Sequence, residues 1–220
     1  MMGGRCGARI AHVVDDLAAA FGAYPRKAVL DRCPHCGPPV RVDECDLFWL
    51  TIKLGNTVGG RQDVKALLPM LFERLITSDE LDAGIVLGKL GQEQWGSWPL
   101  GEQRAVEEFL DAVWHRVLGE FPARVGVFTG AREFLDGVAS AGIGPARYLV
   151  AWENIAGCSA DRHLAALVNE MVRISDSKDA IAAWVRREAV RERLFRAYER
   201  DHAAAWADDF ARAYDLACLL

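Results

Sequence analysis

The chain of 220 residues is mildly acidic, with 26 Lys and Arg against 31 Asp and Glu, and 51% of its residues are hydrophobic. That apolar fraction is typical of a globular protein and excludes an intrinsically disordered chain. The formal charge of -5 argues against a protein that mainly binds phosphate backbones, so nucleic acid is not an expected partner.

The N-terminus and the cysteine content indicate the compartment. Residues 1–9 do not form the apolar segment of a secretion signal, and no stretch reaches the roughly 18 apolar residues of a membrane span. Six cysteines are too few for a disulfide scaffold at this length. We therefore predict a cytoplasmic protein, not a membrane protein, whose cysteines are free thiols or metal ligands.

Helical periodicity dominates the sequence from the N-terminus onward. Apolar residues at spacings of three and four predict amphipathic helices. These helices are expected over residues 10–21, 64–75, 102–120, 164–174, 181–198 and 206–214. Strand signals are nearly absent, since only residues 125–129 have short β-type character and a loop serves equally well there. The pattern predicts an all-α fold of about nine or ten helices.

Glycine and proline clusters separate the helices into pairs over residues 44–76, 82–119, 131–156 and 159–200. Each pair is close in length to a HEAT-type helical hairpin, although no motif repeats from pair to pair. We therefore predict a single domain, residues 1–220, built of HEAT-like helical hairpins in an irregular stack.

Two polar patterns in the last third are given structural roles. Asp161 is expected to cap the N-terminus of the helix around Leu164. Ser177 and Asp179 are expected to cap the next helix. Residues 186–200 carry six arginines and three glutamates, and their spacings of three and four favour a solvated helix face over an anion site.

The motif with the clearest chemical content is Cys33-Pro34-His35-Cys36-Gly37. Two thiolates around a tight turn can bind one zinc ion, and Cys45 is the candidate third ligand. The fourth ligand would be His12, His35 or Asp46, none of which is well suited, and Cys45 is expected to lie in the next helix. The tetrapeptide also resembles the active site of thioredoxin-like thiol oxidases, but residues 37–39 break the chain where that motif needs a long helix.

A third interpretation of the cysteine loop is structural, with the thiols acting as small apolar groups packed on the first helices. This interpretation is slightly favoured over zinc and clearly over redox chemistry. No cofactor is therefore expected, although zinc held by Cys33, Cys36 and Cys45 stays possible on the sequence.

Two further groups have both a chemical and a structural interpretation. Glu107, Asp111 and His115 recur at every fourth residue of one predicted helix, where they can share a metal or form the polar flank expected of an amphipathic helix. Trp95 and Trp98 join two helices, where large aromatic residues usually fill a core. The structural interpretation is favoured for both groups.

The order of landmarks resembles that in a group of bacterial helical proteins of unassigned function. The landmarks, over about residues 10–120, are Tyr24-Pro25-Arg26, Cys33-Pro34-His35-Cys36, Leu68-Pro69, Val86-Leu87-Gly88-Lys89-Leu90 and Trp95-x-x-Trp98-Pro99. The resemblance implies a helical fold and brings no activity or site residues.

Known catalytic signatures are missing from the sequence, including a Walker A loop, Gly-x-Ser-x-Gly and His-Glu-x-x-His. The sequence therefore favours a non-catalytic helical-repeat binding or adaptor protein that recognises a protein or peptide partner. The alternative is a metal- or thiol-dependent enzyme, or a zinc-stabilised protein, built around Cys33, Cys36 and Cys45.

Overall fold

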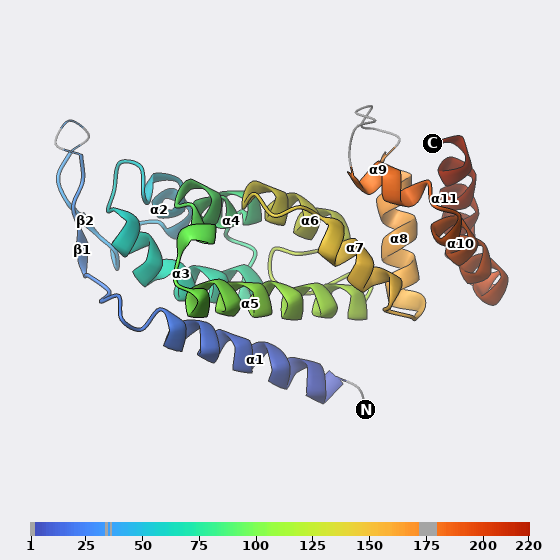
Figure 1. The fold of residues 1–220 in the computed structure, drawn as a ribbon, viewed down its shortest axis with the longest axis horizontal. Helices are drawn as coiled ribbons and strands as arrows, with labels where there is room; N and C mark the ends of the chain where they lie inside the picture. The colour runs from blue at the N-terminus through green and yellow to red at the C-terminus, as the bar shows by residue number, and fades with distance from the viewer. Residues whose placement is uncertain (1–2, 34, 36, 172–179) are drawn as a thin grey trace.

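The protein is an elongated array of helices (Figure 1). The computed structural model describes residues 3–33, 35, 37–171 and 180–220, and their side chains from residue 10 onward. Within these ranges there are eleven α-helices, which confirms the prediction of an all-α fold with roughly ten helices. In chain order the elements are α1 (Gly3–Ala20), β1 (Val29–Leu30), β2 (Val40–Arg41), α2 (Leu47–Lys53), α3 (Arg61–Thr77), α4 (Ala83–Gln92), the 3-10 turn Trp95–Ser97, α5 (Leu100–Gly119), α6 (Ala131–Ser140), α7 (Ala146–Glu153), α8 (Cys158–Met171), α9 (Ala180–Val185), α10 (Glu188–Asp201) and α11 (Ala207–Leu219).

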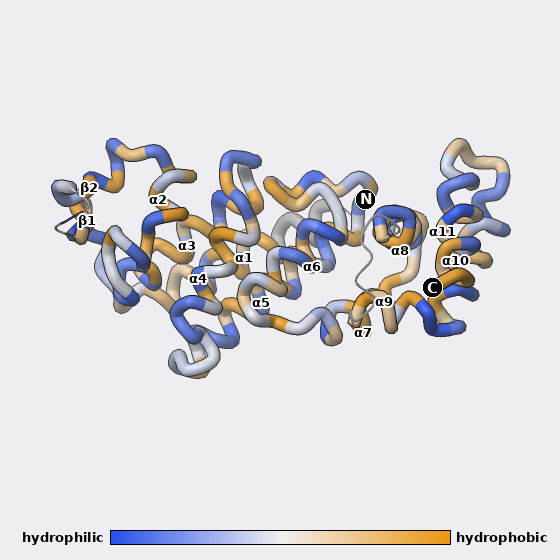
Figure 2. Tube along the Cα trace, turned by 90° about the horizontal axis from the view of Figure 1, so that it is seen from above, coloured by the Kyte–Doolittle hydropathy of each residue, from blue (hydrophilic) through white to orange (hydrophobic). Residues whose placement is uncertain are grey.

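Helix α5 lies along the middle of the array, with α1 packed along it (Figure 1). The helix predicted over residues 102–120 matches α5, and its apolar stripe, including Phe109 and Trp114, is buried. Helix α4 packs mainly on α6, so the most extensive pairings in this half join helices that are not consecutive. Figure 2 shows hydrophobic and hydrophilic residues alternating along these helices, as expected when each buries one face.

One continuous apolar cluster runs through the described residues. At its centre Trp114 stacks on Phe134 with ring centroids 4.9 Å apart and meets Trp152 edge-on at 5.2 Å. Trp152 in turn stacks on Trp184 of α9, which joins the central helices to the C-terminal ones. Among the described helices, none is both long enough and apolar enough to cross a membrane.

The prediction that Asp161 caps a helix is wrong, because α8 begins at Cys158 and Asp161 lies within its first turn. Its side chain is buried and accepts hydrogen bonds from two arginines of α10: Arg193 Nε lies 2.7 Å from Oδ1, and Arg200 Nη1 lies 2.7 Å from Oδ2. Asp161 therefore ties α8 to α10. The predicted caps Ser177 and Asp179 lie outside the described residues.

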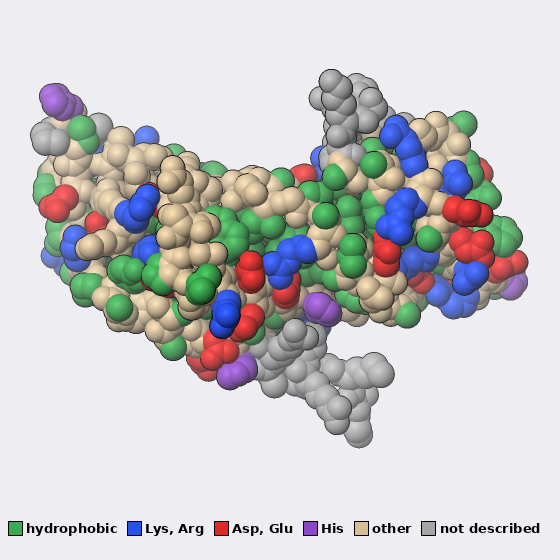
Figure 3. Space-filling view, viewed as in Figure 1, with side chains coloured by type: hydrophobic (Ala, Val, Ile, Leu, Met, Phe, Trp, Pro, Cys, Tyr) green, Lys and Arg blue, Asp and Glu red, His purple; other side chains and the backbone are tan. Residues whose placement is uncertain are grey.

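The arginine-rich helix α10 is only in part the solvated face that its pattern predicts. Arg196 and Glu192 form the expected surface pair at 2.6 Å. Arg193, by contrast, also donates to the carbonyl oxygens of Trp152 and Ile155, each at 2.7 Å, and so holds the loop between α7 and α8. Charged side chains gather over this end of the molecule (Figure 3).

A buried ion pair lies where α3 meets α5. Lys65 Nζ is 2.6 Å from Glu102 Oε2, and each side chain is only 7% exposed. The Tyr24 hydroxyl donates to Glu102 Oε1 at 2.7 Å, and the ammonium also lies 4.5 Å from the centroid of the Trp98 ring. Trp98 is 4% exposed, as its interpretation as a core residue requires, whereas Trp95 is only partly buried.

The fold also contains a two-stranded antiparallel ribbon that the sequence pattern did not predict, in which Val29 pairs with Arg41 and Leu30 with Val40. Strands of two residues are too short to show an alternating pattern. Residues 125–129 form a turn closed by a bridge between Val125 and Phe128. Gly126 has φ +55°, and a Cβ there would lie 2.1 Å from the carbonyl oxygen of Leu75, so only glycine fits against the end of α3.

Candidate functional site

The predicted cysteine site lies at the tip and base of the β1–β2 ribbon, which projects from one end of the array (Figure 1). Cys33 follows β1 in the loop that joins the strands, and its backbone N–H donates to Thr57 O at 2.9 Å. Its Sγ lies 3.9 Å from His35 Nδ1. Cys36 lies outside the described residues. Cys33 therefore lies against the turn that follows α2.

Cys45 follows β2 after the chain has turned back from the ribbon tip. It lies in a turn before α2, not in a helix as the sequence predicted, because α2 begins only at Leu47. Its thiol donates to Val42 O at 3.5 Å, and burial raises the pKa of that thiol, which disfavours the thiolate that a metal requires. Since Cys33 lies on the tip side of the paired residues and Cys45 beyond their base, the ribbon separates these two cysteines.

The remaining ligand candidates have other contacts. Asp46 caps α2, accepting from the backbone N–H of Trp49 at 2.6 Å. His12 pairs with Asp16 at 3.4 Å on the exposed face of α1. In the part of the chain that the structure describes, no three His, Cys, Asp or Glu side chains are grouped as a metal site. Because Cys36 is not among them, the zinc hypothesis for Cys33, Cys36 and Cys45 stays a prediction.

Glu107, Asp111 and His115 form a polar flank of α5, as the structural interpretation of this group predicts. Arg147 of α7 binds Asp111 Oδ2 at 2.6 Å and lies 3.5 Å from Glu107 Oε1. His115 Nδ1 lies 2.8 Å from its own helix's Asp111 carbonyl. The carboxylates thus pair with an arginine that the sequence did not connect with them.

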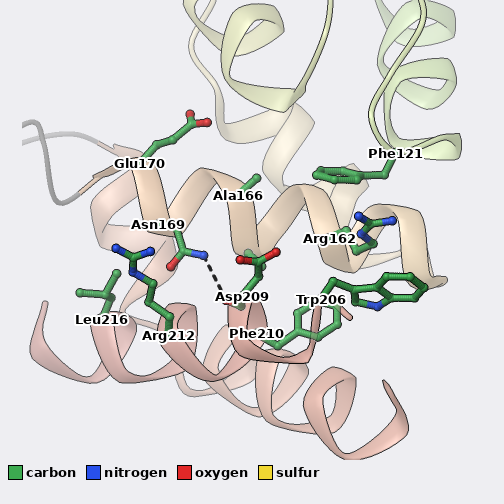
Figure 4. Close-up of a pocket in the computed structure, with 11 residues that line it drawn as sticks. Phe121, Arg162, Ala166, Asn169, Glu170, Trp206, Asp209, Phe210, Arg212 and Leu216 are labelled. Carbon is green, nitrogen blue, oxygen red and sulfur yellow. Dashed lines mark hydrogen bonds between the residues drawn. The ribbon is translucent and has the colours of Figure 1, made fainter. Parts of the chain in front are cut away.

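A groove of about 430 Å³ lies between α8 and α11 and is lined by both polar and apolar side chains. Figure 4 shows its residues: Arg162, Asn169 and Glu170 come from α8, and Asp209, Arg212 and Leu216 come from α11. Trp206 directly precedes α11, and Phe121 lies in the segment that follows α5. Ala165, Ala166 and Phe210 complete the lining. The groove therefore combines apolar walls with groups of both charges.

Arg162 lies between two aromatic rings at one end of this groove. Its guanidinium carbon is 4.3 Å from the centroid of Phe121 and 4.4 Å from that of Trp206. Two such contacts hold the cation in place without neutralising its charge. In the described chain Arg162 forms no ion pair with a carboxylate, so its positive charge stays available to a ligand.

Polar groups from α11 face α8 across the groove. The Asp209 carboxylate points toward α8 in Figure 4, while the Asp209 backbone carbonyl accepts from Asn169 Nδ2 at 3.0 Å. Asn169 Oδ1 is buried and has no hydrogen-bond donor among the described residues. Arg212 is exposed and, within the same ranges, forms no ion pair. A carboxylate and two guanidinium groups that form no ion pair with another described residue thus line one hollow.

This groove was not predicted from the sequence. Trp206 begins the helix predicted over residues 206–214, yet it lies just before α11, is only half-buried and forms a wall of the groove. Arg162 lies beside the apolar stripe of α8, a position at which the sequence pattern predicts that an arginine lies on the surface. One local signal was available. No Asp or Glu stands three or four residues after Arg162, so this arginine lacks the carboxylate partner that a surface arginine usually has on its own helix.

Comparison with known proteins adds no family to this description, because no family model, curated protein or solved structure matches the chain. The candidate site therefore stands on its geometry.

Proposed function

We propose that this protein is a non-catalytic helical-repeat binding protein that recognises a protein or peptide partner through the groove between α8 and α11. The observation that carries the proposal is the group Arg162, Asp209 and Arg212, three charged side chains that line one hollow without ion pairs in the described chain. Oppositely charged side chains that neighbour one another on a helical surface usually form ion pairs.

The lining indicates what kind of partner fits. A polypeptide segment with acidic and basic side chains would complement all three charges, because charge complementarity selects partners and sets their register. The rings of Phe121 and Trp206 would cover its apolar parts, since aromatic residues and arginine dominate the binding energy of protein interfaces. Stacked helical hairpins commonly present such surfaces to polypeptides.

The test is capture of partners from the native host by the purified protein, with quantitative mass spectrometry. The groove variant Arg162→Gln/Arg212→Gln is compared with Arg104→Gln/Arg124→Gln, which removes two exposed arginines elsewhere and so matches the change in net charge. We expect a stoichiometric partner with the wild type and the control, and at least a tenfold loss with the groove variant, as about 1.4 kcal/mol of lost binding energy would give. Equal capture by both variants, or no stoichiometric partner, would refute the proposal.

A second candidate is a zinc-stabilised or thiol-dependent protein built around Cys33, Cys36 and Cys45. The observation that favours it is the 3.9 Å contact between Cys33 Sγ and His35 Nδ1 in an exposed loop, since imidazole and thiol are both zinc ligands. Elemental analysis of protein purified without chelator tests it. About one zinc per chain, lost in Cys33→Ser/Cys36→Ser together with a drop in melting temperature, supports it. Absence of zinc, with thiols that react slowly in the native protein, contradicts it.

A further inference from the structure

A smaller cavity, of about 130 Å³, adjoins the groove where the N-terminus of α6 meets α8. Phe121, Ala166 and Glu170, which are labelled in Figure 4, line both hollows, so the two share a rim.

The buried wall of this cavity carries His163, which is only 2% exposed. Its Nε2 lies 2.9 Å from the backbone carbonyl oxygen of Glu120. A carbonyl oxygen only accepts, so Nε2 carries a hydrogen and, in the neutral ring, Nδ1 carries the lone pair. Burial lowers the pKa of His163 below its usual value, which keeps the ring neutral near pH 7.

Nδ1 of His163 and the carboxylate of Glu133 both lie near one point of the cavity, next to Gly130. A Cβ built on Gly130 would lie 3.9 Å from His163 Nδ1 and 3.0 Å from Glu133 Oε2. Within the described chain no group donates a hydrogen bond to either acceptor. Arg132, which also lines the cavity, is paired with Asp136 at 2.7 Å.

We propose that this cavity binds a primary ammonium group, such as the end of a lysine side chain from the polypeptide held in the groove. A nitrogen that carries three hydrogens can donate to Nδ1 and to the carboxylate at once, and its positive charge complements Glu133. This inference rests on the proposed function, because the shared rim lets one segment reach both hollows. It adds a chemical specificity: a lysine, flanked by residues that complement Arg162, Asp209 and Arg212.

The test uses n-butylammonium, which has the shape and charge of a lysine side chain, with n-butanol as the uncharged control. The readout is the side-chain nitrogen chemical shift of His163, measured by NMR at pH 7.5. We expect a saturable shift of the Nδ1 resonance with the amine and none with the alcohol at the same concentrations. Failure of the amine to produce a saturable shift, or equal binding of butanol, would overturn the inference.

Two variants localise the effect. Gly130→Ala places a methyl group between the two acceptors, and the backbone tolerates it because φ is -164°, an extended value that any residue adopts. Glu133→Gln removes the charge. Each is expected to weaken amine binding by about tenfold or more. Gly144→Ala, where an added Cβ meets nothing within 4 Å, is the matched control and should leave binding unchanged.

Melting temperatures of all variants show whether they are folded, and binding by Gly130→Ala at wild-type strength would count against the site. The probe does not involve the partner, so the two proposals fail separately. If the amine does not bind while partner capture still depends on Arg162 and Arg212, the ammonium site alone is wrong.

Discussion

Replacing Glu102 by Gln should destabilise the protein strongly, because it leaves the ammonium of Lys65 buried without its counter-ion. Both side chains are 7% exposed and the two charges are 2.6 Å apart, so water cannot take the place of the carboxylate. Removing one partner of a buried pair costs about 3–5 kcal/mol. Contacts of Lys65 with the rings of Tyr24 and Trp98 remain, but cation–π contacts are worth only about 1–2 kcal/mol and are already present.

For a chain of this length, that loss corresponds to a melting temperature lower by roughly 6–20 °C, measured by circular dichroism or calorimetry. The double variant Lys65→Met/Glu102→Gln removes both charges and should recover at least half of the loss, because no isolated ion stays buried. The surface control Glu192→Gln, which breaks an exposed pair with Arg196, should cost less than about 1 kcal/mol. A Glu102→Gln variant as stable as that control, or a double variant no more stable than Glu102→Gln, would refute the reasoning.

Three further outcomes follow from the described contacts. Asp161→Asn removes the carboxylate shared by Arg193 and Arg200, and we expect a loss of about 3 kcal/mol in urea unfolding; a loss below about 1 kcal/mol would mean that α8 and α10 do not depend on it. Gly126→Ala combines a positive φ with a clash against the α3 backbone and should cost more than about 3 kcal/mol, whereas Gly144→Ala should cost less than about 1 kcal/mol. His163 has a lowered pKa when folded, so the unfolded chain binds more protons below about pH 6.5 and stability should fall as the pH drops through that range. Urea unfolding at pH 7.5 and pH 5.5 should show a smaller difference for His163→Gln than for the wild type, and an unchanged difference would contradict the assignment.

The parts of the fold that were predictable are those whose residues repeat a local pattern. The helix around Phe109 and Trp114 was predicted within two residues of its ends, because its apolar stripe and Pro99 are both local signals. The β1–β2 ribbon was missed because each strand has only two residues and its partner lies across a loop. Residue spacing carries no information on pairings of that kind.

The same limit applies to polar residues. Asp161 was read as a helix cap, since a local role was the only one visible from its neighbours, whereas its partners Arg193 and Arg200 come from another helix. The groove was missed for this reason too: the setting of Arg162 is formed by Phe121 and Trp206, which are adjacent only after α5, α8 and α11 have packed. Such sites are properties of tertiary contacts.

The packing of α1 on α5 has a consequence for how the protein tolerates loss of its ends. In a solenoid whose repeats contact only their neighbours, a terminal unit can be removed at the cost of one interface. Here the first helix covers the central one, although most of the N-terminal half of the chain separates them. A truncation at residue 21 would therefore expose an apolar face in the middle of the array. For the same reason, duplicating a hairpin between α1 and α5 would disturb the centre of the protein.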